Sequence, residues 1–130
     1  EQEYRGILGG RCRCVWNGKA IVQPGADGTD AQQSNHNLLL SERSEIDAKP
    51  ELEIYADEVK CSHGTTVGQL DDAALFYLRS RGLDKQDAMR ALTRAFGASI
   101  VSHSPIPVVT DHLTELVEGR LSSLTDGDDE

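Results

Sequence analysis

The feature that most constrains the fold is a change of pattern near residue 70. Before it, short β-type runs follow one another with turn residues between them and no helical periodicity. After it, three segments place apolar residues three or four positions apart, as amphipathic helices do. The sequence therefore predicts an α+β protein, with a β region over residues 1–70, a helical domain over 71–124 and an acidic disordered tail over 125–130.

The β region is built from runs that each end at a turn signal. Extended segments are predicted at residues 4–8, 12–16, 19–23, 37–41, 52–57, 59–63 and 66–70. Asn17-Gly18 and Pro24-Gly25 are strong turn dipeptides, and Gly64 is predicted to close a further run. Strands that recur without helices indicate a sandwich or a stacked β-solenoid. Uneven strand spacing favours the solenoid, as does the same-face pair Asn35 and Asn37, which is suited to a side-chain ladder, but no fixed repeat length is visible.

The three predicted helices have recognisable beginnings and ends. Asp71 and Asp84 are suited to N-caps, because a carboxylate accepts hydrogen bonds from the free N–H groups of a first turn. Gly82 fits a left-handed C-cap, Gly97 is predicted to end or bend the second helix, and the prolines of 104–107 break the pattern. The predicted buried stripes are Ala74, Leu75 and Leu78; then Ala88, Leu92, Ala95 and Phe96; then Leu113, Leu116, Val117 and Leu121. Such helices could cover the open end of a solenoid and hide its unpaired backbone groups.

Charge and cysteine content narrow the class of partner and the compartment. The 22 acidic residues outnumber the 13 basic ones and give a net charge of −9, which argues against binding to nucleic acid or to an anionic membrane surface. Three cysteines do not pair into a disulfide framework, so reduced thiols and a cytoplasmic location are predicted. The chain begins directly in strand-like sequence, which indicates a segment of a longer protein.

The sharpest candidate site is Cys61 with His63. On a strand, residues two apart project from one face, and a thiolate beside an imidazole is a soft metal site of the kind that iron–sulfur clusters use. These two groups supply half of a four-coordinate shell, so a second chain or region must contribute the rest. The alternative reading is a half-buried strand with Cys61 in the core and His63 as a solvated ring.

Other chemical patterns carry less information. Cys12 and Cys14 form a Cys-x-Cys without a matching second pair, so a role in core packing is predicted for them. A nucleophile pair of Cys61 and His63 lacks an orienting acid and an oxyanion site, which argues against an enzyme. The chain has no glycine-rich phosphate loop of the Walker or dinucleotide type.

Long stretches of the sequence resemble the SufB/SufD family of iron–sulfur cluster assembly scaffolds. The most specific are 29–41 (TDAQQSNHNLLLS), 45–64 (EIDAKPELEIYADEVKCSHG), 66–71 (TVGQLD) and 75–82 (LFYLRSRG). Within 61–64, Cys-Ser-His-Gly resembles the SufD branch, whereas the SufB branch carries an acidic residue between its cysteine and histidine. The resemblance covers nearly the whole chain as a C-terminal fragment, and it lacks the upstream two-thirds of a family member.

The resemblance implies a right-handed parallel β-helix followed by a small C-terminal helical domain. It implies a non-catalytic scaffold that docks the ABC-type ATPase SufC through the helices of about 71–124, with ATP hydrolysis left to SufC. It also implies pairing with SufB, or a SufD homodimer, through the terminal β-helix strands. His63 and Cys61 would then contact iron or a nascent iron–sulfur cluster shared with SufB, with no cofactor stably bound. The alternative is a pure interaction module that makes no contact with the cluster.

Overall fold

The computed structural model describes residues 1–125, with side chains to residue 122, as five strands followed by three helices. The strands are β1 (Gln2–Leu8), β2 (Arg13–Val22), β3 (Asp30–Leu39), β4 (Glu45–Ile54) and β5 (Lys60–Gly68). The helices are α1 (Asp72–Ser80), α2 (Lys85–Val101) and α3 (Pro107–Thr125). This order confirms the mixed α+β class. Thr125, placed at the start of the predicted tail, is the last residue of α3, and the remaining tail residues 126–130 lie outside the described part.

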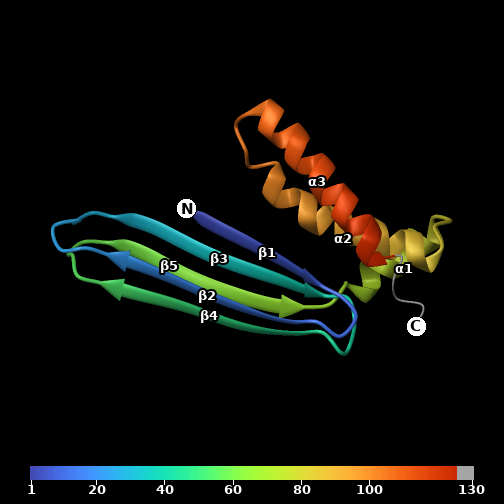
Figure 1. The fold of residues 1–130 in the computed structure, drawn as a ribbon, viewed down its shortest axis with the longest axis horizontal. Coiled ribbons are helices and arrows are strands. Elements are labelled where there is room, and N and C mark those ends of the chain that lie inside the picture. Colours follow the sequence, from blue (N-terminus) through green and yellow to red (C-terminus); the bar gives the residue numbers. More distant parts are fainter. Residues whose placement is uncertain (126–130) are drawn as a thin grey trace.

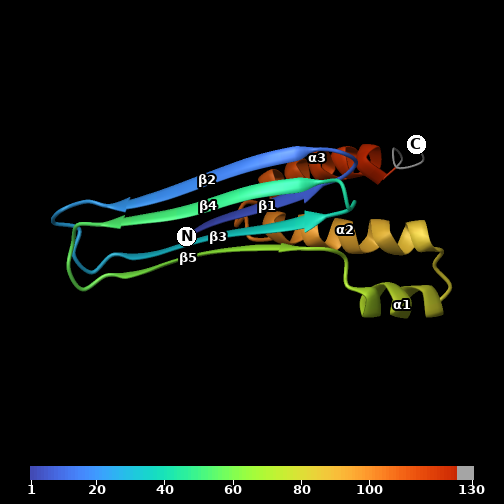
Figure 2. The ribbon, with the colours of Figure 1, turned by 90° about the horizontal axis from the view of Figure 1, so that it is seen from below.

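The strands alternate between two parallel sheets. One sheet has the order β1-β3-β5 and the other contains β2 and β4. Figure 1 shows that β1, β3 and β5 run toward the helices, whereas β2 and β4 run away from them. Each successive strand of a sheet follows its neighbour in register, with Gln2 opposite Gln33 and Gln33 opposite His63. Figure 2 shows the helices gathered at one end of the sheets.

The inner faces of the two sheets differ in character. Gln33, Asn35 and Asn37 of β3 are buried, with exposures of 5%, 2% and 4%. In β2, every second residue from Trp16 onward is at least half-buried. The centre of the Trp16 ring lies 5.3 Å from the centre of the Tyr4 ring in β1. The buried polar side chains of β3 therefore lie among apolar inner-face residues of β1 and β2.

Two glycines predicted to end strands lie inside them instead. β2 runs through Asn17-Gly18, and β5 runs through Gly64, because each segment pairs continuously with a parallel neighbour that overrides its local turn preference. Gly18 has a packing role: a Cβ added there would lie 2.3 Å from the ring of Trp16 and 2.8 Å from Gln33 Oε1. Glycine is therefore needed where the Trp16 ring and the Gln33 amide cross the β2 backbone.

The helix caps agree with the prediction. Asp71 accepts hydrogen bonds from the backbone N–H groups of Ala73 and Ala74 at 2.7 and 3.0 Å. Asp84 accepts one from Asp87 at 2.8 Å, and Gly82 has a φ of 101°. α1 and α2 thus begin directly after the residue whose side chain satisfies their first free donors.

The second helix corrects two expectations. α2 continues through Gly97, where a Cβ would lie 3.3 Å from Ile7 Cδ1 and 3.5 Å from Val117 Cγ1. The absence of a side chain lets α2 approach β1 and α3 closely, so Gly97 serves packing and not termination. Ala95, placed in the buried stripe, is exposed, whereas Ala88 is fully buried.

The third helix has two apolar faces where one was predicted. Leu121 is 8% exposed and Val117 is half-buried, and both lie against Gly97 of α2. Leu113 and Leu116 are 38% and 53% exposed, and with Val109 they lie at positions i, i+4 and i+7 on a second face. We call Val109, Leu113 and Leu116 the outer ridge of α3. Placing Leu113 and Leu116 in the buried stripe was wrong, because the helix packs on one side only.

Within residues 1–125, no helix combines the length and the apolar character needed to cross a bilayer.

Candidate functional site

The structure places Cys61 and His63 on β5, at the edge of the larger sheet. Since successive residues of a strand point to opposite faces, both side chains project to the same side as their neighbours Ala31 and Gln33 in β3. Gln33 is buried between the sheets, so this side is the inner face. Cys61 is half-buried and His63 is exposed, because β5 pairs with β3 on one edge only.

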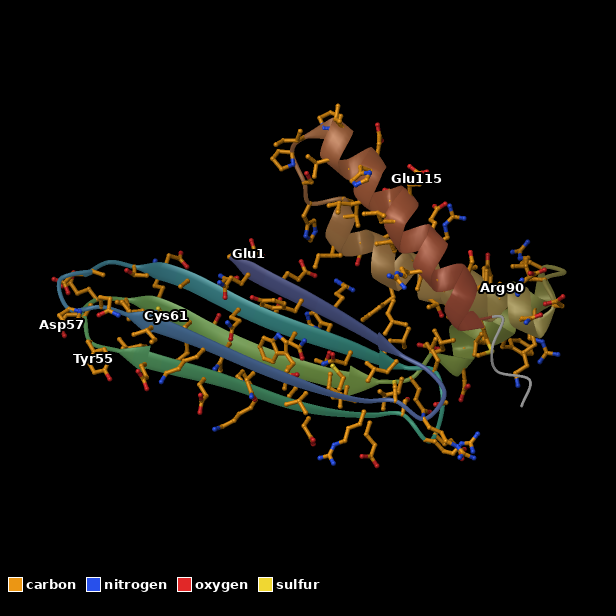
Figure 3. The ribbon with its side chains drawn as sticks, viewed as in Figure 1. Glu1, Tyr55, Asp57, Cys61, Arg90 and Glu115 are labelled. Carbon is orange, nitrogen blue, oxygen red and sulfur yellow. The ribbon has the colours of Figure 1, made fainter. Side chains whose placement is uncertain are left out.

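The candidate site lies away from the helices. Figure 3 shows Cys61 at the end of the sheets near Tyr55 and Asp57, whereas Arg90 and Glu115 mark the helical end. The strand from Cys61 to Gly68 covers about 23 Å at a rise of roughly 3.3 Å per residue. Cys61 and the outer ridge of α3, which includes Leu116 next to Glu115, therefore lie on separate surfaces.

A buried polar network continues along the inner face from His63. Thr65 Oγ1 donates a hydrogen bond to Asn35 Oδ1 at 3.1 Å, and Asn37 Nδ2 donates to the Thr66 carbonyl at 3.2 Å. Asn37 therefore satisfies a backbone carbonyl group of β5. The hydrogen-bond partners of Asn35 and Asn37 in β5 are Thr65 and Thr66. In place of the predicted ladder of asparagines, these strands are joined by a network of asparagines and threonines.

The other two cysteines do not pack in the core. Cys12 precedes β2 and Cys14 lies near its start, and both are exposed. The prediction of a packing role was wrong, because the inner face of β2 becomes covered only from Trp16 onward. Among the described residues, no group of three or more His, Cys, Asp or Glu side chains is placed to hold a metal ion. The metal-binding role of Cys61 and His63 remains a prediction.

A second cluster, which sequence reasoning missed, joins the sheets to the helices. Arg5 of β1 donates to Glu3 Oε1 through Nε and Nη2 at 3.0 and 2.8 Å, and its guanidinium carbon lies 4.8 Å from the centre of the Phe96 ring in α2. His103 Nδ1 lies 2.9 Å from Glu3 Oε2. The side chains of Arg5 and Glu3 are 20% and 14% exposed. We call these four residues the β1–α2 joint. The only sequence signal for it was the opposite charge of Glu3 and Arg5 on one strand face.

The β1–α2 joint makes the free energy of unfolding depend on pH. The hydrogen bond from Arg5 is the main cause that lowers the pKa of Glu3 below its ordinary value of 4.5, and partial burial opposes this. A lowered pKa means that the stabilisation is complete above pH 4.5 and is lost as the pH falls through the lower folded-state value.

Arg5→Leu is expected to lower the free energy of unfolding by about 2 kcal/mol at neutral pH, because it leaves the half-buried Glu3 carboxylate without its main partner. Urea unfolding at neutral pH and below pH 4.5 measures this, and the variant should lose less stability on acidification than the parent does. Arg13→Leu is the matched control, since the Arg13–Asp47 pair has side chains 66% and 56% exposed and should contribute little to the free energy of unfolding. If Arg5→Leu and Arg13→Leu lowered the free energy of unfolding equally, a structural role for the β1–α2 joint would be contradicted.

Comparison with known proteins gives one consistent result. The family model for the SUF system FeS cluster assembly SufBD core domain matches residues 1–96. Over 99 residues the chain is 50% identical to iron-sulfur cluster assembly protein SufD of Escherichia coli K12, covering 76% of this chain and 23% of that protein. It is 43% identical over 119 residues to a SufBD family protein of Synechocystis, covering 92% and 26%. It is 34% identical over 116 residues to SufD of Bacillus subtilis, covering 89% and 26%. The chain thus spans about a quarter of the length of these curated relatives.

Proposed function

The chain belongs to the SufB/SufD family of iron–sulfur cluster assembly proteins of the SUF system, and from this premise we propose that it is a scaffold segment with two working surfaces. One surface is the edge of β5, where Cys61 and His63 meet a sister scaffold and the nascent cluster. The other is the outer ridge of α3, where the SufC ATPase docks. The segment performs no chemistry alone, and ATP hydrolysis belongs to SufC.

The strands are proposed to form the last turns of a right-handed parallel β-helix. Alternation between two parallel sheets, with successive strands in register, is the arrangement expected of stacked coils. Connections between parallel strands of one sheet are right-handed in nearly all proteins, which supports the handedness. Such a stack ends in an open strand, and here that strand is β5.

The observation that carries the cluster-site proposal is the position of Cys61 and His63 on this open edge. Every residue from 62 to 68 is exposed, and the outer edge of β5 presents backbone groups suited to pairing with another chain. An iron–sulfur cluster takes four ligands, mostly thiolates with histidine as an alternative. This strand offers two, so we propose that SufB, or a second SufD copy, supplies the others across the paired edge. Iron and sulfide are the cargo of this site and not resident cofactors.

The SufC surface is proposed from exposed apolar side chains. Val109, Leu113 and Leu116 are 40%, 38% and 53% exposed, and beside them Ile106 and Val108 are 55% and 78% exposed. Clustered exposed apolar side chains of this kind mark protein-binding surfaces. ATP-driven conformational changes in SufC would shift the equilibrium of the scaffold between two conformations. The rigid strands would couple this conformational change at α3 to β5.

Co-purification with SufC tests the docking surface. The complete protein should retain SufC, and a form lacking residues 84–121 should lose it, because the deletion removes α2 and the outer ridge together. Circular dichroism should show the β signal retained in the deleted form. Undiminished SufC retention by that form, with the strands still folded, would place docking elsewhere.

A further inference from the structure

Two exposed thiols lie at the beginning of β2, outside the candidate cluster site. Cys12 and Cys14 are free cysteines, and neither is covered by the fold. Cysteine is among the residues that proteins bury most often, and the reactivity of a thiol usually decides its role where packing does not. Packing accounts for neither residue here, so the feature left to explain is their affinity for a ligand.

The backbone places both thiols on one face of the strand. The carbonyl of Cys12 accepts the backbone N–H of the first residue of β4 at 2.9 Å, so the parallel ladder already includes Cys12. Arg13, between the two cysteines, donates to Asp47 Oδ2 through Nε at 3.0 Å on the outer face of the sheet. Since successive residues of a strand point to opposite faces, Cys12 and Cys14 both project to the other side, in line with Trp16.

The spacing of the pair suits one ion held between two sulfurs. Residues i and i+2 of a strand lie about 6.6 Å apart, at roughly 3.3 Å per residue. With a metal–thiolate bond of about 2.3 Å on each side, an ion between two sulfurs needs them about 4.6 Å apart. Side chains of strands lean along the strand direction, so rotation about one bond in each cysteine closes the difference of about 2 Å.

The number of ligands selects the kind of ion. Thiolates prefer soft ions such as Cu(I), zinc and the iron of clusters. Zinc and cluster iron take four ligands, whereas no group of three His, Cys, Asp or Glu side chains in the described part of the chain includes this pair. Cu(I) is a closed-shell ion that is stable between two thiolates in a line. The residue opposite Cys14 in β4 is the half-buried Ile46, which offers no competing polar group.

We propose that Cys12 and Cys14 form a two-coordinate site for a soft monovalent cation of the Cu(I) class. Each thiol releases one proton, and the two thiolates bind one Cu(I), so the complex carries one negative charge and nothing is oxidised or reduced. The site is separate from the candidate cluster site. β2 begins at the helical end of the sheets (Figure 1), whereas Cys61 lies at the opposite end (Figure 3).

Competition with the colorimetric chelator bicinchoninate for Cu(I) tests the proposal in the complete, reduced protein without oxygen. Cys12→Ser and Cys14→Ser should each weaken the binding of one Cu(I) equivalent by about 100-fold or more, since loss of a mere outer partner of a ligand already costs about 10- to 100-fold. Affinity in the parent protein should fall as the pH is lowered, because protons compete for both thiolates. Superimposable competition curves for the parent and either variant would overturn the proposal.

Cys61→Ser is the matched control, because Cys61 is the remaining free thiol of this chain and lies on another strand. This variant should keep the Cu(I) equivalent that Cys12→Ser and Cys14→Ser lose. If Cys61→Ser lost that equivalent and Cys12→Ser kept it, the ion would belong to the candidate cluster site and the proposal would fail. X-ray absorption at the copper edge should show two sulfur neighbours, and the loaded protein should keep its size in gel filtration. Copper-dependent pairing of two chains would contradict a site within one strand.

Discussion

His63→Ala in the complete protein is expected to lower cluster formation on the SUF scaffold by about 10-fold or more, since it removes a proposed ligand and not merely its support. His63 is exposed on an edge strand, so its removal leaves the fold intact and the loss falls on the site. The measurement is the visible absorption of the cluster formed during reconstitution with iron, a sulfur source, SufB, SufC and ATP.

His36→Ala is the matched control for His63→Ala. His36 lies on the neighbouring strand, but at a position that alternates with the buried residues Asn35 and Asn37, so its ring points to the outer face. Its ring nitrogen Nδ1 makes a hydrogen bond of 2.8 Å with Thr66 Oγ1. Cluster formation should remain near that of the parent protein in this variant.

The double variant Cys61→Ser with His63→Ala separates the scaffold proposal from the pure interaction module. If both side chains contribute ligands, the double variant should form no more cluster than His63→Ala alone. Full cluster formation by the double variant, with SufC and SufB still bound, would show that this strand only holds partners together and that the ligands lie elsewhere.

Leu116→Asp is expected to weaken SufC binding by about 30-fold or more, because central apolar residues of an interface commonly contribute about 2 kcal/mol or more. Leu116 is 53% exposed on the outer ridge, so an aspartate there is solvated in the free protein and desolvated in the complex. Titration calorimetry of SufC into the complete scaffold measures the change in dissociation constant.

Glu115→Lys serves as the control for Leu116→Asp. It changes the charge of the same helix turn by two units but lies off the outer ridge, at an exposed position. SufC affinity should change less than about 3-fold, as expected for a charge at the rim of an interface. Equal weakening by the two variants would mean that net charge, and not the apolar ridge, governs docking.

The two surfaces predict separable defects. Leu116→Asp should lose SufC binding, whereas His63→Ala should keep SufC and lose the cluster. Since Figure 3 places Cys61 and Glu115 of α3 well apart, we expect any coupling between the two sites to pass through the strands and the β1–α2 joint.

Local signals in the sequence were sufficient for the helix boundaries. Asp71, Asp84 and Gly82 act through atoms of their own helix ends, so their roles do not depend on distant parts of the chain. The same is true of the class of fold, because the period of apolar residues changes at the point where strands give way to helices. The placement of Cys61 and His63 on one strand face likewise followed from their spacing of two.

Other features depended on which segments meet in three dimensions. Gly18 and Gly97 look like breaks in the sequence, yet the structure uses each as a place for a neighbour, the Trp16 ring in one case and Ile7 in the other. The exposure of Leu113 and Leu116 arises from how α3 packs on α2, and the pairing of Arg5 with Phe96 across 91 positions of sequence arises from how α2 packs on β1. The sequence by itself determined the elements and the chemistry they carry, since these rest on contacts within a few residues. Only the tertiary structure decided which apolar face is covered and which polar atom is left without a partner, because burial is a property of neighbours that are far apart along the chain.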